Sequence, residues 1–163
     1  QTPAQAVTNV ATAGATLGGL IKSLIVAKGA KYVLVMNIPD VAATPFAKHQ
    51  SADTQGLIAA MTQAFNQQLA AQLAGVSGVV VGDAYSESQA IVANPAQYAV
   101  SNVTTPACGP NNLGTSSLVC NASNVIAGDV SHYYFADDVH PTPYGHQLLS
   151  QFASKLMAQA GWL

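Results

Sequence analysis

Two short segments of this sequence are apolar on both faces, and each follows a helical pattern. They are "YVLVM" (32–36) and "VVVGD" (79–83). Continuous apolar runs of this length are typical of parallel strands covered by helices on both sides, so the alternation predicts an α/β fold. Two strands alone would leave a long apolar edge unpaired, which is an aggregation hazard. We therefore expect further strands from another polypeptide or from a larger fold.

The helices are predicted from the spacing of apolar residues and from the signals at their ends. A stretch from about residue 97 to 130 is rich in Asn, Ser, Thr, Gly and Pro, and is expected to be irregular. No repeat or interdomain linker interrupts the chain, so one domain is expected. The four expected helices cover residues 2–29, about 51 or 53 to 73, 87–95 and 142–161.

The charge composition argues against two classes of partner. The chain has five lysines, no arginine and a net charge of −2, so we expect no nucleic-acid partner. We also expect no transmembrane segment, because Lys22, Lys28 and Lys31 interrupt the most apolar region.

The segment "FADDVHPTPYGH" (135–146) concentrates charge in a chain that is only 7% charged. Asp137 precedes His140 by three residues, close enough for the carboxylate to accept the Nδ1 proton and leave Nε2 as a base. A solvated histidine in an acidic turn that caps the following helix would give the same spacing. A zinc site that uses His132, His140, His146 and the aspartates is a further alternative, although no two histidines have the spacing of a helical ligand pair.

A histidine base needs a nucleophile, and the sequence offers no clear one. No serine lies in a Gly-x-Ser-x-Gly elbow or follows a strand on a tight glycine turn. Ser86 and Ser88, after "VVVGDAY", come nearest but lack the glycines.

Cys108 and Cys120 bracket the loop "GPNNLGTSSLV". A disulfide that closes this loop in an oxidising compartment is the favoured interpretation, and two buried thiols in a cytoplasmic protein are the alternative.

The segment "YFADDVHPTPYGH" resembles the last conserved block of the SGNH (GDSL-type) serine esterases and lipases, Asp-x-x-His followed by Pro-Thr. "GAKYVLVMNIPDVAATP" resembles an upstream strand and its Asn-(Leu/Ile)-Pro continuation in that family. "VVVGDAYSESQAIVANPAQYAVSNVTTPAC" is similar to the secreted bacterial lipase/phospholipase branch. The similarity covers nearly all of the chain in the family's order.

The resemblance implies that residues 1–163 are the C-terminal part of a single SGNH hydrolase domain. The fold would be a three-layer α/β/α flavodoxin-like sheet, of which this chain supplies the last two parallel strands and the flanking helices. By the same resemblance His140 is the general base and Asp137 its partner. The blocks that carry the nucleophile and the oxyanion hole would lie in a companion N-terminal polypeptide.

The expected function is therefore a carboxylic-ester hydrolase, secreted or held in the periplasm or on the outer surface. It would act on a lipid or another acylated molecule through a Ser–His–Asp triad, with no cofactor and no metal. The main alternative is a non-catalytic interaction or carbohydrate-binding domain with an esterase-like fold.

Overall fold

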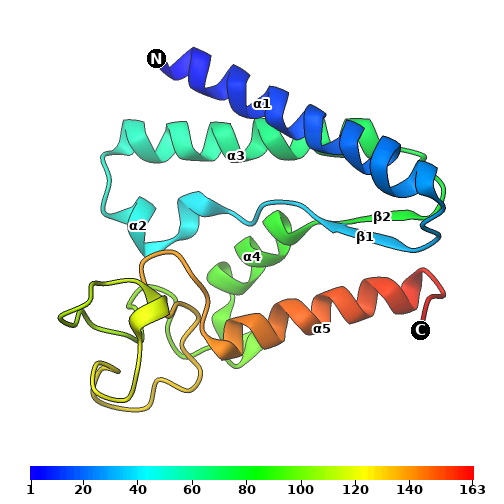
Figure 1. The fold of residues 1–163 in the computed structure, drawn as a ribbon. Helices are drawn as coiled ribbons and strands as arrows, with labels where there is room; N and C mark the ends of the chain where they lie inside the picture. The colour runs from blue at the N-terminus through cyan, green and yellow to red at the C-terminus, as the bar shows by residue number, and fades with distance from the viewer.

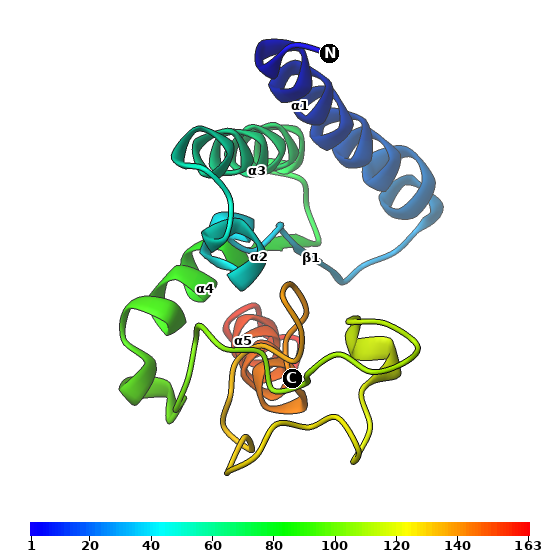
Figure 2. The same cartoon turned by 90° about the vertical axis from the view of Figure 1, so that its left-hand side faces the viewer.

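The computed structural model describes all 163 residues and is a mixed α/β fold. Its sheet has two parallel strands, β1 (Val33–Met36) and β2 (Val79–Gly82). Helices α1 (Pro3–Leu20) and α3 (Ala52–Leu73) lie on one side of the sheet, and α5 (Pro143–Gln159) lies on the other (Figures 1 and 2). The α/β class and the parallel pairing expected from the two apolar segments are confirmed.

The two strands pair with Val33 opposite Val79 and Met36 opposite Gly82. The amides of Val33 and Asn37 donate to the carbonyls of Gly78 and Gly82, both at about 3.0 Å. Because amides alternate between the two sides of a strand, those of Leu34 and Met36 point to the opposite edge of β1. No strand pairs with that edge.

Helix α1 begins and ends where the sequence predicts. Thr2 and Gln5 form a capping box around Pro3, which satisfies two amides that have no partner within the helix. After Leu20 the helix continues as one π turn (Ile21–Ile25) and one 3₁₀ turn (Val26–Lys28). Gly29 ends it with a φ of 97°, a conformation that favours glycine.

Helix α1 packs against α3 through two glycines. A Cβ atom at Gly14 would collide with the backbone carbonyl of Phe65, and one at Gly18 with the Cβ of Gln72. Gly19, the next residue, has open space around it. The two helices therefore approach each other more closely than a side chain at Gly14 or Gly18 would permit.

The segment Pro3–Lys28 is the one helix long and apolar enough to cross a membrane, judged by length and composition alone. Its mean hydropathy is 1.6, and 17% of the window is buried. Lys22 and Lys28 lie near its C-terminal end, and Pro3–Leu20 carries no charged side chain. The absence of a transmembrane segment stays an expectation. Core helices of soluble proteins and signal sequences have the same length and composition.

The remaining helices follow the predicted pattern with two differences. Ser51 caps α3, and Thr142 caps α5, as expected. Helix α4 (Ala84–Ala93) begins three residues earlier than predicted, because the Asp83 side chain accepts the amide of Ser86. The four-residue helix α2 (Pro45–Lys48), capped by Thr44, was not predicted.

Buried apolar side chains form two separate clusters. One joins the sheet to α3 and to the π turn after α1, and contains Ile21, Leu69 and Leu73. The other lies between α4, α5 and the loop that precedes α5; its buried members are Ile91, Val100, Tyr134, Phe135 and Leu148. The second cluster holds the segment that carries Asp137 and His140.

Candidate catalytic site

Asp137 and His140 lie in a tight turn that leads into α5, here called the Asp137–His140 turn. The amide of Ala136 donates to the carbonyl of His140 at 2.8 Å and closes the turn. From outside, the amide of Phe46 in α2 donates to the carbonyl of Asp138 at 2.9 Å. The turn is thus fixed by its own backbone and by α2, which follows β1.

The residues on both sides of the turn anchor it to the core. Tyr134 and Phe135 are buried, with ring centroids 4.8 Å apart in an edge-to-face arrangement. Thr142 is buried and accepts the amide of Gly145 at 3.0 Å. A Cβ at Gly145 would lie 2.9 Å from the carbonyl oxygen of Tyr134, so glycine permits this close approach.

Asp137 is only 5% exposed, and its carboxylate accepts four hydrogen bonds. The Nδ1 atom of His140 lies 2.8 Å from Oδ2 and 3.0 Å from Oδ1. The amides of Val139 and His140 donate to Oδ1 at 2.8 and 2.6 Å. The fourth donor is the amide of Ser117, 2.6 Å from Oδ2.

These donors decide the charge of the carboxyl group. Burial by itself raises the pKa of Asp137, but the amides of His140, Ser117 and Val139 and the His140 ring together outweigh it. The net result is a pKa for Asp137 well below its usual range. An ionised carboxylate against Nδ1 requires the proton on that nitrogen, which leaves Nε2 with its lone pair free.

The imidazole of His140 is accessible from outside. Its side chain is 62% exposed, and the hydrogen bonds of the ring involve Nδ1 alone. The arrangement of a buried carboxylate, an oriented imidazole and an unpartnered Nε2 is able to take a proton from a hydroxyl group.

The serines that came nearest to a nucleophile have structural roles. The hydroxyl of Ser86 donates to Asp83 at 2.5 Å. Ser88 is buried; its hydroxyl donates to the carbonyl of Tyr85 and accepts the amide of Asp40, both at 2.9 Å. No serine hydroxyl forms a hydrogen bond with His140.

Polar residues at the carboxyl ends of the strands tie the two strand ends together. Asn37 after β1 donates to Asp83 after β2 at 2.8 Å, and accepts the amide of Tyr85 at 2.9 Å. Burial acts to raise the pKa of Asp83, but hydrogen bonds from Ser86, Asn37 and Tyr85 lower it overall. Asp40 caps a 3₁₀ turn (Val41–Ala43). Turn-making and capping account for all three residues.

The histidines do not converge on a metal site. No group of three or more His, Cys, Asp or Glu side chains is placed to hold a metal ion. His132 stacks on Tyr144 with ring centroids 4.2 Å apart, and its Nδ1 lies 2.6 Å from the carbonyl oxygen of Ala99. The zinc alternative therefore lacks a ligand set in this structure.

A cavity of about 170 Å³ lies beside the Asp137–His140 turn, under Val139 and Pro141. Its lining is mainly apolar and comes from α4, α5 and the segment after β1. His140 is not among the residues that line this cavity.

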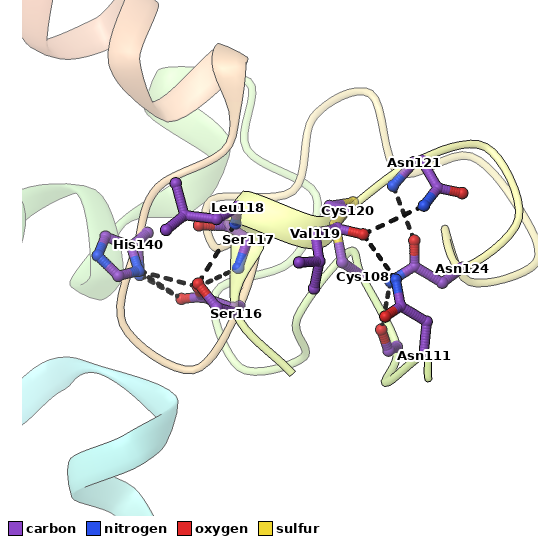
Figure 3. Close-up of a disulfide and its surroundings, with 12 residues drawn as sticks. Cys108, Asn111, Ser116, Ser117, Leu118, Val119, Cys120, Asn121, Asn124 and His140 are labelled. Atoms are coloured by element: carbon purple, nitrogen blue, oxygen red, sulfur yellow. Dashed lines mark hydrogen bonds and ion pairs between the residues drawn. A yellow bond between two sulfur atoms is a disulfide. The ribbon is translucent and has the colours of Figure 1, made fainter. Parts of the chain in front are cut away.

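Cys108 and Cys120 form a disulfide, as the sequence analysis favoured. Figure 3 shows that Ser117 lies beside His140, at the other end of a short 3₁₀ helix (Ser117–Val119) from Cys120. Sequence reasoning did not identify Ser117 as part of the site, because a backbone amide in an irregular loop leaves no signal in residue types.

Comparison with known proteins identifies the family. The model of the GDSL-like lipase/acylhydrolase family matches residues 1–152. The chain belongs to this family. The resemblance drawn from the Asp-x-x-His and upstream segments is thus confirmed.

Two plant proteins and one bacterial protein are similar to this GDSL family member. A GDSL esterase/lipase of Arabidopsis thaliana is 26% identical over 134 residues, or 75% of this chain and 37% of the relative. GDSL esterase/lipase APG of the same plant is 26% identical over 141 residues, or 77% and 39%. An uncharacterized protein encoded between trpE and trpG in Pseudomonas putida is 31% identical over 163 residues, or 94% and 26%. The chain spans less than two fifths of the length of each.

Proposed function

We propose that this chain is the catalytic-histidine part of a serine ester hydrolase of the SGNH type. Asp137 and His140 supply two members of a Ser–His–Asp triad, and a companion N-terminal polypeptide supplies the serine and the oxyanion hole. His140 Nε2 takes the serine proton as the hydroxyl oxygen attacks the ester carbonyl. The same nitrogen then returns the proton to the leaving alcohol, and water hydrolyses the acyl-enzyme.

The observation that carries this proposal is the geometry of the Asp137–His140 pair. A carboxylate that is 5% exposed holds Nδ1 at 2.8 Å, while the rest of the imidazole is exposed. A histidine that merely caps a helix needs no buried carboxylate with three amide donors behind it.

We place the nucleophile outside residues 1–163 because of the hydrogen bonds that the serines of this chain form. The hydroxyl of Ser86 donates a hydrogen bond to Asp83, and that of Ser88 donates one to the carbonyl of Tyr85. No serine hydroxyl of the chain forms a hydrogen bond with the imidazole of His140. The relatives are more than twice as long as the matched segment, which leaves room for the missing parts of the site.

The exposed surface supports a companion that completes the sheet. The chain exposes 9042 Å², whereas a compact monomer of 16.6 kDa exposes about 7,600 Å². Leu17 and Leu20 in α1, and Leu24 in the π turn that follows it, are between 38% and 61% exposed. These residues lie on one helical stripe, which the rest of a five-stranded, three-layer SGNH domain would cover.

The disulfide supports a location outside the reducing cytoplasm. Disulfides persist in secreted and periplasmic proteins and are rare where glutathione keeps thiols reduced. We infer secretion, or retention in the periplasm or on the outer surface, for this protein.

The test is to label the full-length protein and any companion polypeptide with a fluorophosphonate probe, and to assay hydrolysis of short p-nitrophenyl esters. The probe should label a serine N-terminal to this segment. His140→Ala should abolish labelling and turnover, because the serine then remains a weakly nucleophilic hydroxyl. Asp137→Asn should lower turnover by roughly four orders of magnitude through loss of the correct tautomer.

His146→Ala is the matched control, since this exposed histidine lies in the first turn of α5 and forms no side-chain hydrogen bond. Label on one of the serines within residues 1–163 would overturn the division of the triad. Absence of any phosphonate-sensitive hydrolysis would instead favour the non-catalytic alternative.

A further inference from the structure

The Cys108–Cys120 disulfide loop contacts the carboxylate of Asp137 directly. Of the four donors to that carboxylate, three come from Val139 and His140 within the turn itself. The fourth, the amide of Ser117, comes from the disulfide loop and bonds to Oδ2. This oxygen is also the nearer acceptor for His140 Nδ1.

Both half-cystines are bonded to the residues that flank this contact. The amide of Cys108 donates to the carbonyl of Ala136, the neighbour of Asp137, at 2.9 Å. The amide of Cys120 donates to the carbonyl of Ser117 at 3.1 Å. Covalent bonds and hydrogen bonds together therefore form a closed ring. It passes from Asp137 through Ala136, Cys108, the disulfide, Cys120 and Ser117 and returns to Asp137.

Two side-chain hydrogen bonds also hold the disulfide loop in place. Asn111 donates to the carbonyl of Val119 at 2.6 Å, and Asn124 donates to the carbonyl of Gly109 at 2.6 Å. These bonds fix the loop on both sides of the disulfide, so the amide of Ser117 has little freedom to leave Oδ2.

We propose that the disulfide loop is a positioning device for the catalytic acid: through the Ser117 amide it fixes the direction of Asp137 Oδ2 and hence the orientation of His140. Ser117 acts through Asp137 and is a positioning residue, not a catalytic one. The inference rests on the proposed function for its effect on turnover, but the hydrogen bond itself is testable without any activity.

A proline at position 117 removes this amide proton and puts the ring Cδ where the proton was, so that the carboxylate of Asp137 can no longer stay at its place beside residue 117. Ser117 is the first residue of the 3₁₀ helix, where proline is well accepted, and Ser116 before it has φ −70° and ψ 146°, the extended conformation that precedes proline. The experiment compares S117P with S117A in the full-length protein, because both lack the hydroxyl and only S117A keeps the amide proton.

S116P is the proline control. The φ of −70° at Ser116 fits the proline ring, and the amide of Ser116 donates no hydrogen bond. The one hydrogen bond lost with its side chain is the 3.3 Å bond from the amide of Leu118 to Oγ. Any effect of a proline ring on the loop as such will appear in S116P as well as in S117P.

Two readouts are measured on each variant: kcat and KM for a p-nitrophenyl ester, and the NMR resonance of the His140 Nδ1 proton. We expect kcat of S117P to fall about tenfold or more below that of S117A with KM nearly unchanged, because a hydrogen bond to a charged group is lost. The Nδ1 proton should move upfield or broaden in S117P and keep its low-field position in S116P and S117A.

Equal kcat and an equal Nδ1 resonance in S117P and S117A would overturn the inference. If S117P fails to fold, the double variant C108S/C120S decides, since it keeps the amide but frees the loop. It should show the same upfield shift or broadening, and an unchanged resonance there would overturn the inference. A wild-type protein without phosphonate-sensitive activity would refute the proposed function, and the resonance would still report on the positioning.

Discussion

Asp137 receives most of its support from its own turn. The amides of Val139 and His140 and the His140 ring all lie within three residues of the carboxylate. A four-residue Asp-x-x-His segment can therefore build the carboxylate–imidazole pair locally, which explains why the pair was evident in the sequence. Its burial, by contrast, depends on the fold around it.

The lowered pKa of Asp137 makes the stability of the fold depend on pH. An unfolded aspartate has a pKa of about 3.9, and the folded-state pKa of Asp137 lies below that. The interactions of the ionised group therefore stabilise the fold fully above about pH 4 and are lost as the pH falls through the folded-state value. Asp137→Asn should lower the free energy of unfolding by about 1–3 kcal/mol at neutral pH, and by less near pH 2.

Urea denaturation of the full-length protein at the two pH values measures this effect. Asp138→Asn is the control, because the neighbouring side chain is exposed and accepts no hydrogen bond. A loss of stability in D137N that is equal at both pH values would show that the charge of Asp137 does not contribute.

The elements of the fold were largely predictable. The start of α1 at Pro3, the end of the helical segment at Gly29, both strands, and the caps of α3 and α5 follow from local signals that tertiary structure did not override. Helix α2 was missed because four residues are too few for a periodic pattern. The role of Ser117 was missed because its contribution is a backbone amide, which every residue except proline carries.

The packing of α1 on α3 gives a prediction at this scale. Gly14→Ala should lower the free energy of unfolding by about 1–3 kcal/mol, because the new Cβ collides with the backbone carbonyl of Phe65. Gly19→Ala, on the same helix in open space, should stabilise the protein by up to about 1 kcal/mol through helix propensity. Thermal unfolding of both variants measures the two changes in the free energy of unfolding. Similar changes for the two would mean that the helices do not approach closely at Gly14.

At the scale of the whole molecule, little of the chain is buried. Only 24 of 163 residues are buried. The two apolar clusters therefore contain only a small part of the chain's apolar side chains. No strand pairs with the edge of β1 opposite β2, and we place the companion polypeptide there and over the exposed Leu17, Leu20 and Leu24.

Hydrogen exchange distinguishes a completed sheet from an open one. In the full-length protein, the amides of Leu34 and Met36 should exchange as slowly as those of Val33 and Val35, because a further strand accepts them. The amides of Val33 and Val35 are the internal reference, since both point to the paired side of β1, where Val33 donates to the carbonyl of Gly78 just before β2. Fast exchange confined to Leu34 and Met36 would contradict the proposed completion of the sheet.

The hydrogen bond between the Phe46 amide and the Asp138 carbonyl also affects the order of folding. It joins a segment that follows the first strand to one that immediately precedes the last helix. Contacts between such distant parts of a chain form slowly, because much chain entropy is lost before they are made. The Asp137–His140 turn should therefore take its final position late in refolding, after the helices have formed. Recovery of a native His140 environment should lag behind recovery of helical circular dichroism.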